Sequence, residues 1–285
     1  MKKFKITVSS GKGGTGKTFF SVNLFYTLKE NFKTALIDLD VEEPNAGLFI
    51  DFKNFKKEIS YLTIPEVDRE KCILCGNCSE YCEFNAIFVT TDKWYLFPEL
   101  CKGCTACIKL CPHNALKYGK KEHGVIKWSE NGFMEGRLKL KEPISVPLIE
   151  KTKQKAIKEF EKFEIFIFDS PPGVTCSTIA SIKDSDFIVL VAEPTPFGFN
   201  DFKLTYEMLK NFNIPFGVVI NRYDIGDNEL DYFCKEHNIP ILTKIPHNEK
   251  IAENYSKGIP LVIANPEYKD YFFSAFENLK MRLNK

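Results

Sequence analysis

The sequence lacks a strong net charge and lacks any long apolar run. Its 39 lysines and arginines nearly balance its 38 aspartates and glutamates, which leaves a formal net charge of +1. A chain this close to neutrality offers no bulk electrostatic attraction for nucleic acid or for a membrane surface. No apolar run approaches the ~20 residues that a membrane-spanning helix needs. We therefore expect no nucleic-acid partner and no membrane span.

The first residues also lack the apolar segment of a signal peptide. The stretch MKKFKITVSSGKGG has a basic start, but its apolar part is too short and a glycine-rich loop follows at once. The composition, 44% hydrophobic and 27% charged, is ordinary for a globular protein. A chain of 285 residues can hold one large α/β domain and a smaller module. We expect a cytoplasmic protein.

Cysteine, in contrast, is abundant and clustered. Eight of the ten cysteines lie in two short groups, and in a chain expected to be cytoplasmic such groups indicate metal rather than disulfides. The groups form an internal repeat with an offset of 29 residues, which the pair Asn85-Ala86 and Asn114-Ala115 shares. The repeated cysteines are Cys72, Cys75, Cys78 and Cys82, then Cys101, Cys104, Cys107 and Cys111.

Each group has the spacing C-x2-C-x2-C-x3-C, which is typical of bacterial ferredoxins. Three close thiolates bind one face of a [4Fe–4S] cluster, and the fourth thiolate comes from the other repeat. The spacing therefore predicts two clusters. The expected ligands are Cys72, Cys75, Cys78 and Cys111 for the first, and Cys82, Cys101, Cys104 and Cys107 for the second. Zinc is the alternative, because C-x2-C pairs also bind it.

Apolar runs on both sides of this module predict an α/β protein. Residues 3–9 and 33–39 are expected strands that flank a glycine turn and a helix near 17–30, which together make a βαβ unit. After a polar connector we expect strands at 164–169, 187–192, 216–221 and 240–242, and helices at 147–162, 200–212, 227–237, 248–257 and 267–283. The predicted fold is a doubly wound, mostly parallel sheet. The larger domain comprises 1–62 and 120–285, and a bacterial-ferredoxin-like α+β module is inserted at 63–119.

The first strand leads into a phosphate-binding loop. Residues 11–18 fit G-x-x-x-x-G-K-[ST] between a strand and a helix. Backbone N–H groups of such a loop surround the phosphates of a nucleotide. Lys17 is expected to reach the β- and γ-phosphates, and the Thr18 hydroxyl to bind Mg²⁺. The other expected nucleotide-binding residues of the loop are Gly11, Gly13, Gly14, Thr15 and Gly16.

An extra lysine, Lys12, sets this loop apart. The stretch KGGTGKT resembles the deviant Walker A motif of the Mrp/MinD-type ATPases, a group that includes the nitrogenase iron protein and plasmid-partition ATPases. The resemblance implies that ATP and Mg²⁺ are cofactors and that the chain dimerises. It also implies that Lys12 crosses the dimer interface to the partner's nucleotide, where its charge acts as an arginine finger does. An ordinary exposed loop lysine is the alternative.

The same resemblance assigns roles to residues at the ends of strands. IDLDVEEPN is similar to the family's first switch, which implies that Asp40 orients the attacking water and that Asp38 lies near Mg²⁺. The two could instead be turn-capping carboxylates. FDSPPG is similar to the second switch, so Asp169 would hold Mg²⁺ through water and Gly173 would donate its N–H to the γ-phosphate. Asn221 would read the adenine edge, or be an ordinary strand-end residue.

Two cysteines lie outside the repeat. Cys234, in the helical stretch ELDYFCKEH, is expected in the core. Cys176 follows Asp169 by seven residues, as a cluster-binding cysteine does in the nitrogenase iron protein, but the second ligand of that protein has no counterpart here. Cys176 is thus either a functional thiol at a dimer face or a buried bystander.

Three functions follow from these features. The leading hypothesis is an ATPase, a homodimer or a heterodimer with a similar chain, whose nucleotide cycle gates electron transfer through two clusters to a redox partner protein. An iron–sulfur assembly or carrier ATPase is the alternative, although the chain lacks a C-x-x-C pair outside the module. A MinD-type positioning ATPase would need an amphipathic membrane tail. We expect the apolar stripe of the last helix to pack in the core instead. That stripe comprises Phe272, Phe276, Leu279 and Leu283.

Overall fold

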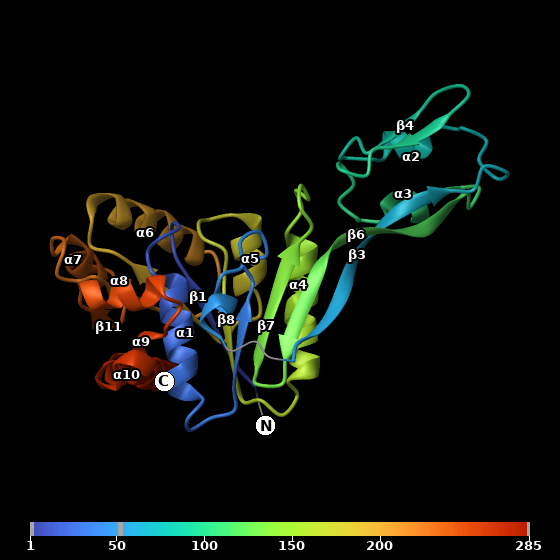
Figure 1. Ribbon diagram of the computed structural model, residues 1–285. Coiled ribbons are helices and arrows are strands. Elements are labelled where there is room, and N and C mark those ends of the chain that lie inside the picture. Colours follow the sequence, from blue (N-terminus) through green and yellow to red (C-terminus); the bar gives the residue numbers. More distant parts are fainter. Residues whose placement is uncertain (1–2, 51–53, 284–285) are drawn as a thin grey trace.

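The computed structural model describes residues 3–50 and 54–283 (Figure 1). Within these residues a nine-stranded sheet has the order β11-β10-β9-β1-β8-β2-β7-β6-β3. Neighbouring strands from β11 to β7 are parallel, and β6 and β3 extend that edge in antiparallel fashion. The strands are β1 (Phe4–Ser9), β2 (Thr34–Asp38), β3 (Lys56–Val67), β6 (Leu116–Ser129), β7 (Phe133–Leu138), β8 (Ile165–Asp169), β9 (Phe187–Ala192), β10 (Phe216–Asn221) and β11 (Ile241–Ile245).

Helices cover both faces of the sheet. One face packs against α1, α9 and α10, and the other against α4 to α7. The helices of this domain are α1 (Lys17–Leu28), α4 (Val146–Glu159), α5 (Cys176–Ile182), α6 (Pro196–Leu209), α7 (Glu229–Glu236), α8 (Glu249–Ser256), α9 (Leu261–Ala264) and α10 (Lys269–Leu283), with 3₁₀ turns η1 (Ala46–Phe49) and η2 (Pro266–Tyr268).

Strand β8 shows how the sequence produces this layered core. Ile165 and Ile167 face the cluster around α1 and α10, whereas Phe166 and Phe168 face the cluster around α4. All four side chains are buried. A continuous apolar run is what a parallel strand covered on both faces requires. The predicted α/β fold with a large, mostly parallel sheet is confirmed.

The stretch between the cysteines and α4 is not the expected polar connector. It forms most of β6 and all of β7, and β3 precedes the module, so both expected domain boundaries fall inside strands. Strands β3 and β6 pair along their length, from Lys56 opposite Trp128 to Val67 opposite Leu116. Backbone hydrogen bonds rather than an apolar run hold this ribbon, so charged residues are tolerated on its solvated face.

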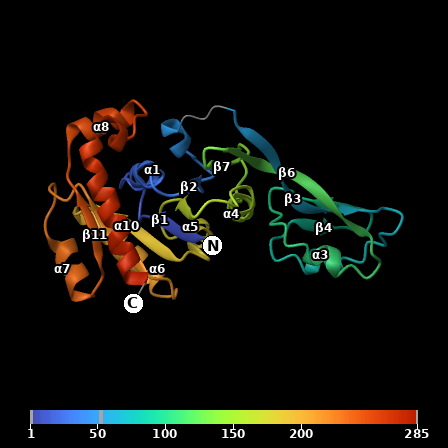
Figure 2. The same cartoon turned by 90° about the horizontal axis from the view of Figure 1, so that it is seen from below.

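The ribbon of β3 and β6 carries the cysteine-rich module away from the main sheet (Figures 1 and 2). The module contains α2 (Asn77–Glu80), α3 (Ala106–Lys109), β4 (Ile87–Val89) and β5 (Trp94–Leu96). Its backbone is duplicated at the same offset as its cysteines. The short helices correspond, and positive φ angles recur in the pairs Leu74 and Gly103, Gly76 and Thr105, and Asn85 and Asn114.

Two minor predictions are settled by burial. Cys234 is fully buried in the cluster around α6 and α7, which confirms its place in the core. On α10, Phe272, Phe276 and Leu279 are buried as expected, but Leu283 is 37% exposed because it ends the helix. Over the described residues, no helix combines the length and the apolar character needed to cross a bilayer.

Candidate functional site

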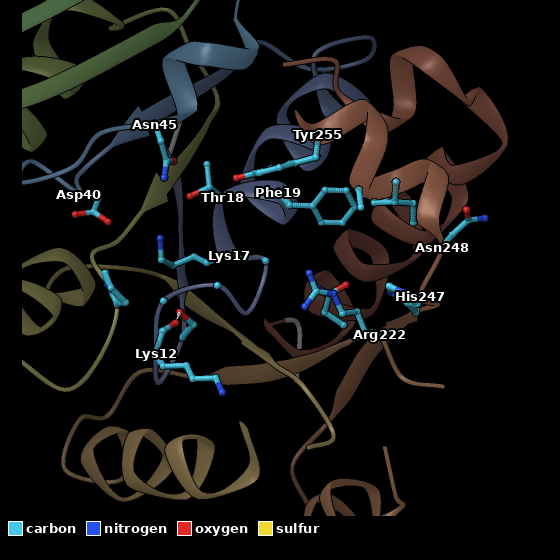
Figure 3. A pocket seen from close by; sticks show the side chains of 18 of the residues that line it. Lys12, Lys17, Thr18, Phe19, Asp40, Asn45, Arg222, His247, Asn248 and Tyr255 are labelled. Carbon is cyan, nitrogen blue, oxygen red and sulfur yellow. Dashed lines mark hydrogen bonds between the residues drawn. The ribbon is translucent and has the colours of Figure 1, made fainter. Parts of the chain in front are cut away.

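A cavity of about 510 Å³ lies where the parallel strands end (Figure 3). This is the edge at which open α/β sheets bind ligands, and the volume suits a nucleotide. Its wall combines the phosphate loop with both predicted switches. The lining residues named by the sequence are Lys12, Gly13, Gly14, Gly16, Lys17, Thr18, Asp40 and Asn221.

Asp169, at the end of β8, is the centre of the buried polar network. Its carboxylate accepts hydrogen bonds from the Thr18 hydroxyl at 2.6 Å and from the Ser21 hydroxyl at 2.9 Å. Lys17 Nζ lies 3.3 Å from the same carboxylate, and both groups are buried. A threonine hydroxyl beside a carboxylate is the donor set that a hydrated Mg²⁺ ion uses in phosphate loops. The fold therefore brings together the residues predicted for phosphate and Mg²⁺.

Asp38, which was expected near Mg²⁺, binds backbone N–H groups of the loop that follows it. Its carboxylate accepts backbone hydrogen bonds from Asp40 at 3.0 Å and from Asn45 and Ala46 at 2.9 Å each. Burial raises the pKa of Asp38 to about 8, and the charge of Asp169 acts in the same direction. These bonds shape the loop between β2 and η1. The geometry therefore shows turn capping, which was the alternative to the Mg²⁺ role. A contact with the Mg²⁺ shell stays a prediction.

Asp40 lies in the wall of the cavity and is half-buried. Burial raises the pKa of its carboxyl to about 6, against the opposing charge of Lys17. A carboxylate with a pKa this near to neutrality is a better proton acceptor than an ordinary aspartate. Its position and chemistry suit a group that orients water, and this role stays a prediction.

Lys12 lies at the rim of the cavity and does not share the direction of Lys17. Its Nζ is 3.9 Å from Asp201 on α6, and Figure 3 shows the side chain directed away from Lys17. Gly11 permits this close approach of α6, because a Cβ there would lie 2.3 Å from the Asp201 carbonyl oxygen. Lys12 therefore does not reach the phosphate position of its own chain in this arrangement.

Asn221 and Gly173 are both engaged with the phosphate loop. The Asn221 amide donates to the Thr15 carbonyl at 2.9 Å, and a Cβ on Gly16 would lie 2.3 Å from that amide nitrogen. The Gly173 N–H donates to the Ser10 carbonyl at 2.9 Å. Gly173 would have to exchange this bond to meet a γ-phosphate. Reading of the adenine edge by Asn221 also stays a prediction.

One wall of the cavity was not predicted. It comes from the ends of β10 and β11 and from α8, and comprises Arg222, Pro246, His247, Asn248, Ile251, Ala252 and Tyr255. The sequence does not show that α8 folds back over the phosphate loop. A usable signal was the position of residues 246–248 directly after a parallel strand, because such ends face the site.

The second predicted set of cysteines lies together in the module. Burial raises the pKa of the Cys107 thiol to about 11, and the nearby Cys101 and Cys82 contribute to this rise. Cys82 thus joins cysteines of the other repeat. One small cavity is lined by Cys82, Cys101, Cys104 and Cys107, together with Phe84 and Lys102.

The first set is arranged around the same small apolar core. Cys78 and Cys111 both pack against it, and burial together with the nearby thiols of Cys72 and Cys75 raises the pKa of Cys78. Backbone N–H groups donate at 3.3 Å to the sulfurs of Cys82 and Cys111, in each case from the alanine of a repeated Asn-Ala pair. In the described part of the chain, no group of three or more His, Cys, Asp or Glu side chains is arranged to hold a single metal ion.

A groove of about 890 Å³ joins the module to the nucleotide site. Phe84 and Lys102, which also line the second cysteine cavity, form its module side. The opposite side is formed by both switches and by the loop before α4. Those residues are Asp40, Glu42, Glu43, Pro143, Ile144, Ser145, Val146, Pro147, Pro171, Pro172, Thr175, Cys176 and Ser177. Cys176 is exposed here, so it is not a buried bystander.

Comparison with known proteins supports the nucleotide site. The profile of the CobQ/CobB/MinD/ParA nucleotide binding domain matches residues 6–261. Two uncharacterized proteins of Methanocaldococcus jannaschii are similar to this chain. One is 34% identical, with 97% of this chain and 96% of the relative covered. The other is 33% identical, with 89% of each covered.

More distant matches are similar along most of the chain. The iron–sulfur cluster carrier protein of Methanococcus maripaludis is 23% identical, with 98% of this chain and 86% of that protein covered. The solved structure of the septum site-determining protein MinD of Pyrococcus horikoshii, a complex with Mg-ADP, superimposes with a TM-score of 0.57. It is 19% identical and covers 97% of this chain and 95% of its own. At that identity the structural likeness shows the fold alone.

Proposed function

Because the chain belongs to the CobQ/CobB/MinD/ParA family of nucleotide-binding ATPases, we propose that its ATP cycle gates electron transfer through two [4Fe–4S] clusters to a redox partner protein. The observation that carries this proposal is the groove, because one surface is lined by Asp40 of the first switch and by Lys102 of the module. A nucleotide that reorders the switch changes the surroundings of the second cysteine set.

The ATPase half of the proposal rests on the network around Asp169. The loop amides and Lys17 hold the phosphates, while Thr18 and Asp169 hold Mg²⁺. Asp40 orients a water that attacks the γ-phosphorus, the bond to the β–γ bridging oxygen breaks, and ADP leaves with that electron pair. Lys12 acts on the nucleotide of a second, similar chain, since its side chain points away from its own phosphate position.

The cysteine half rests on the chemistry of the donor sets. Four thiols line the cavity of the second set. They fit a [4Fe–4S] cluster, in which each iron binds one cysteine sulfur, whereas a zinc site needs all four cysteine sulfurs around a single ion. When bound, a [4Fe–4S] cluster accepts and donates single electrons. The chain supplies N–H donors to the sulfurs of Cys82 and Cys111, and such bonds tune the potential of a cluster.

A hydrogen-bonded connection links the second switch with the module. Ser177, at the start of α5, shares a hydrogen bond of 2.6 Å with Ser145 before α4. In the same loop, Glu142 pairs with Lys121 at 2.7 Å, and Lys121 also donates to the Pro98 carbonyl within the module at 3.1 Å. Movement of the second switch can therefore reach the module along these bonds and the backbone between Glu142 and Ser145, as well as across the groove.

The test is the midpoint potential of each cluster with and without Mg-ATP, after anaerobic reconstitution. The chain should then hold about eight irons and eight sulfides, four of each per cluster. In an Asp40→Asn variant, which prevents turnover, coupling of about 1–3 kcal/mol would shift a potential by about 40–130 mV. Lys17→Ala, which loses the phosphate contact, is the control that should show no shift. Equal potentials in a protein that holds both clusters and binds ATP would refute the gating. Stoichiometric zinc in anaerobically purified protein would refute the clusters.

A second candidate is transfer of a cluster to client proteins. It is favoured by the relatives named iron–sulfur cluster carrier proteins and by the exposure of Cys75 and Cys104, one in each set. Transfer of iron and sulfide to an apo-ferredoxin, faster with ATP and insensitive to an iron chelator in solution, would establish it. A cluster that remains bound through many redox cycles would exclude it. The buried stripe on α10 offers nothing for the MinD-type alternative.

A further inference from the structure

Tyr255 brings a hydroxyl into the nucleotide cavity from an unexpected direction. It lies on α8, and in Figure 3 its hydroxyl end extends toward Thr18. Thr18 is the residue whose own hydroxyl is bonded to Asp169. The tyrosine therefore approaches the part of the cavity where phosphates and Mg²⁺ would lie, opposite the phosphate loop.

The ring of Tyr255 is held in this direction by aromatic contacts. It lies against Phe49, with ring centroids 4.6 Å apart, and meets Phe19 edge-on at 6.4 Å. Phe19 directly follows Thr18, and Phe49 ends the 3₁₀ turn whose first residue is bonded to Asp38. Aromatic pairs of this geometry restrict the ring, so the position of the hydroxyl follows from packing on two parts of the site.

Within the described part of the chain, the Tyr255 hydroxyl has no protein acceptor. No described residue forms a hydrogen bond with it, whereas the hydroxyl of Thr18, which lines the same cavity, is bonded to Asp169. Burial raises the pKa of this phenol, and the charges of Asp169 and Asp38 act in the same direction. The group is thus a neutral O–H donor throughout the physiological range. The Tyr255 side chain is 39% exposed, so its hydroxyl can exchange a contact with water for an acceptor on a bound ligand.

We propose that the Tyr255 hydroxyl donates a hydrogen bond to a phosphate oxygen of the bound nucleotide. Phosphate oxygens are strong acceptors, and the phosphate loop places them beside Thr18. The same contact joins α8 to the loop after the first switch, because the ring packs on Phe49. Tyr255 thus positions the nucleotide from the wall opposite the loop. This inference rests on the nucleotide binding proposed above and adds a residue to it.

The experiment compares Tyr255→Phe with Tyr255→Ala by calorimetric titration with AMP, ADP and ATP in the presence of Mg²⁺. Tyr255→Phe keeps the ring and removes only the hydroxyl, so the thermal midpoint without nucleotide should not change. Loss of a hydrogen bond to a charged acceptor should weaken ATP and ADP binding about tenfold or more. Tyr255→Ala should weaken binding further, because the support on Phe49 and Phe19 is also lost. Tyr232→Phe, on the exposed face of α7, is the matched control and should bind as the unaltered protein does.

The AMP titration locates the contact. Loss of AMP affinity in Tyr255→Phe would place the hydroxyl at the α-phosphate, and unchanged AMP affinity with weaker ADP would place it at the β-phosphate. ATP and ADP affinities equal to those of the unaltered protein would overturn the proposal. Tighter binding by Tyr255→Ala would also overturn it, because the ring would then be an obstruction. Failure of the unaltered protein to bind any nucleotide would overturn the proposed function as well, and it would be seen before any variant is compared.

Discussion

Replacement of Asp40 by asparagine should abolish hydrolysis and at the same time stabilise the fold. The reason is the environment of the carboxyl group, since burial raises its pKa to about 6 from the ordinary value of 3.8. A raised pKa means that the folded chain keeps a proton that the unfolded chain has already lost. Ionisation of Asp40 therefore opposes folding as the pH rises from about 4 to about 6, and its cost is constant above that range.

The size of the effect follows from the shift. A difference of about two pKa units corresponds to about 3 kcal/mol, at about 1.4 kcal/mol per unit. Because Asp40 is only half-buried, solvent screening reduces this to about 1–2 kcal/mol. An asparagine carries no charge at any of these pH values. Near pH 4 the variant and the unaltered protein should thus have the same free energy of unfolding. Above pH 6 the free energy of unfolding of the variant should be higher by about 1–2 kcal/mol.

The assay is urea unfolding of both proteins without nucleotide at pH values from 4 to 8, so that Mg²⁺ and phosphates do not alter the charge balance. Glu42→Gln, which neutralises an exposed carboxylate two residues away, is the control and should show no comparable gain. ATP hydrolysis by Asp40→Asn should fall by about 10²–10⁴-fold if Asp40 aligns the water. A variant that is no more stable at pH 8 than the unaltered protein would show that Asp40 is not penalised by burial. Undiminished ATP hydrolysis would show that Asp40 does not align the attacking water.

Three further expectations concern the loop and the clusters. Lys12→Ala should keep ATP binding but lose hydrolysis and the ATP-dependent dimer seen by light scattering, whereas Lys17→Ala should lose binding itself; equal losses in binding would make Lys12 an ordinary loop residue. Cys111→Ser should leave about four irons per chain and remove the EPR signal of the cluster held by the first repeat. Loss of the signal of the second cluster instead would show that Cys111 does not bind the first. Gly16→Ala should abolish nucleotide binding and lower the free energy of unfolding by about 2 kcal/mol. The added Cβ would meet the Asn221 amide, and the φ angle of Gly16 is positive. An ATP affinity equal to that of the unaltered protein would contradict this.

The sequence predicted those parts of the fold in which neighbouring residues carry the information. Strands such as β8 and β9 are continuous apolar runs because both faces are covered, and this pattern is visible in any one strand. Strands β3 and β6 were missed because their stability comes from pairing with each other. Charged residues at these positions are compatible with a strand only where a partner strand pairs with the backbone and solvent covers the face that carries the charges.

The same division applies to the candidate site. The order of residues alone determined the phosphate loop, the strand-end carboxylates and the repeated cysteines, because loop geometry and ligand spacing are local properties. Only the tertiary structure decided that Asp38 caps a loop, that Lys12 turns toward Asp201 and that Tyr255 enters the cavity from α8. It also decided that Lys102 shares a groove with Asp40. Except for the short loop that Asp38 caps, these contacts join residues that lie far apart in the sequence. Their meeting depends on how the helices and the ribbon of β3 and β6 are placed on the sheet, and packing is a property of the whole chain rather than of a motif.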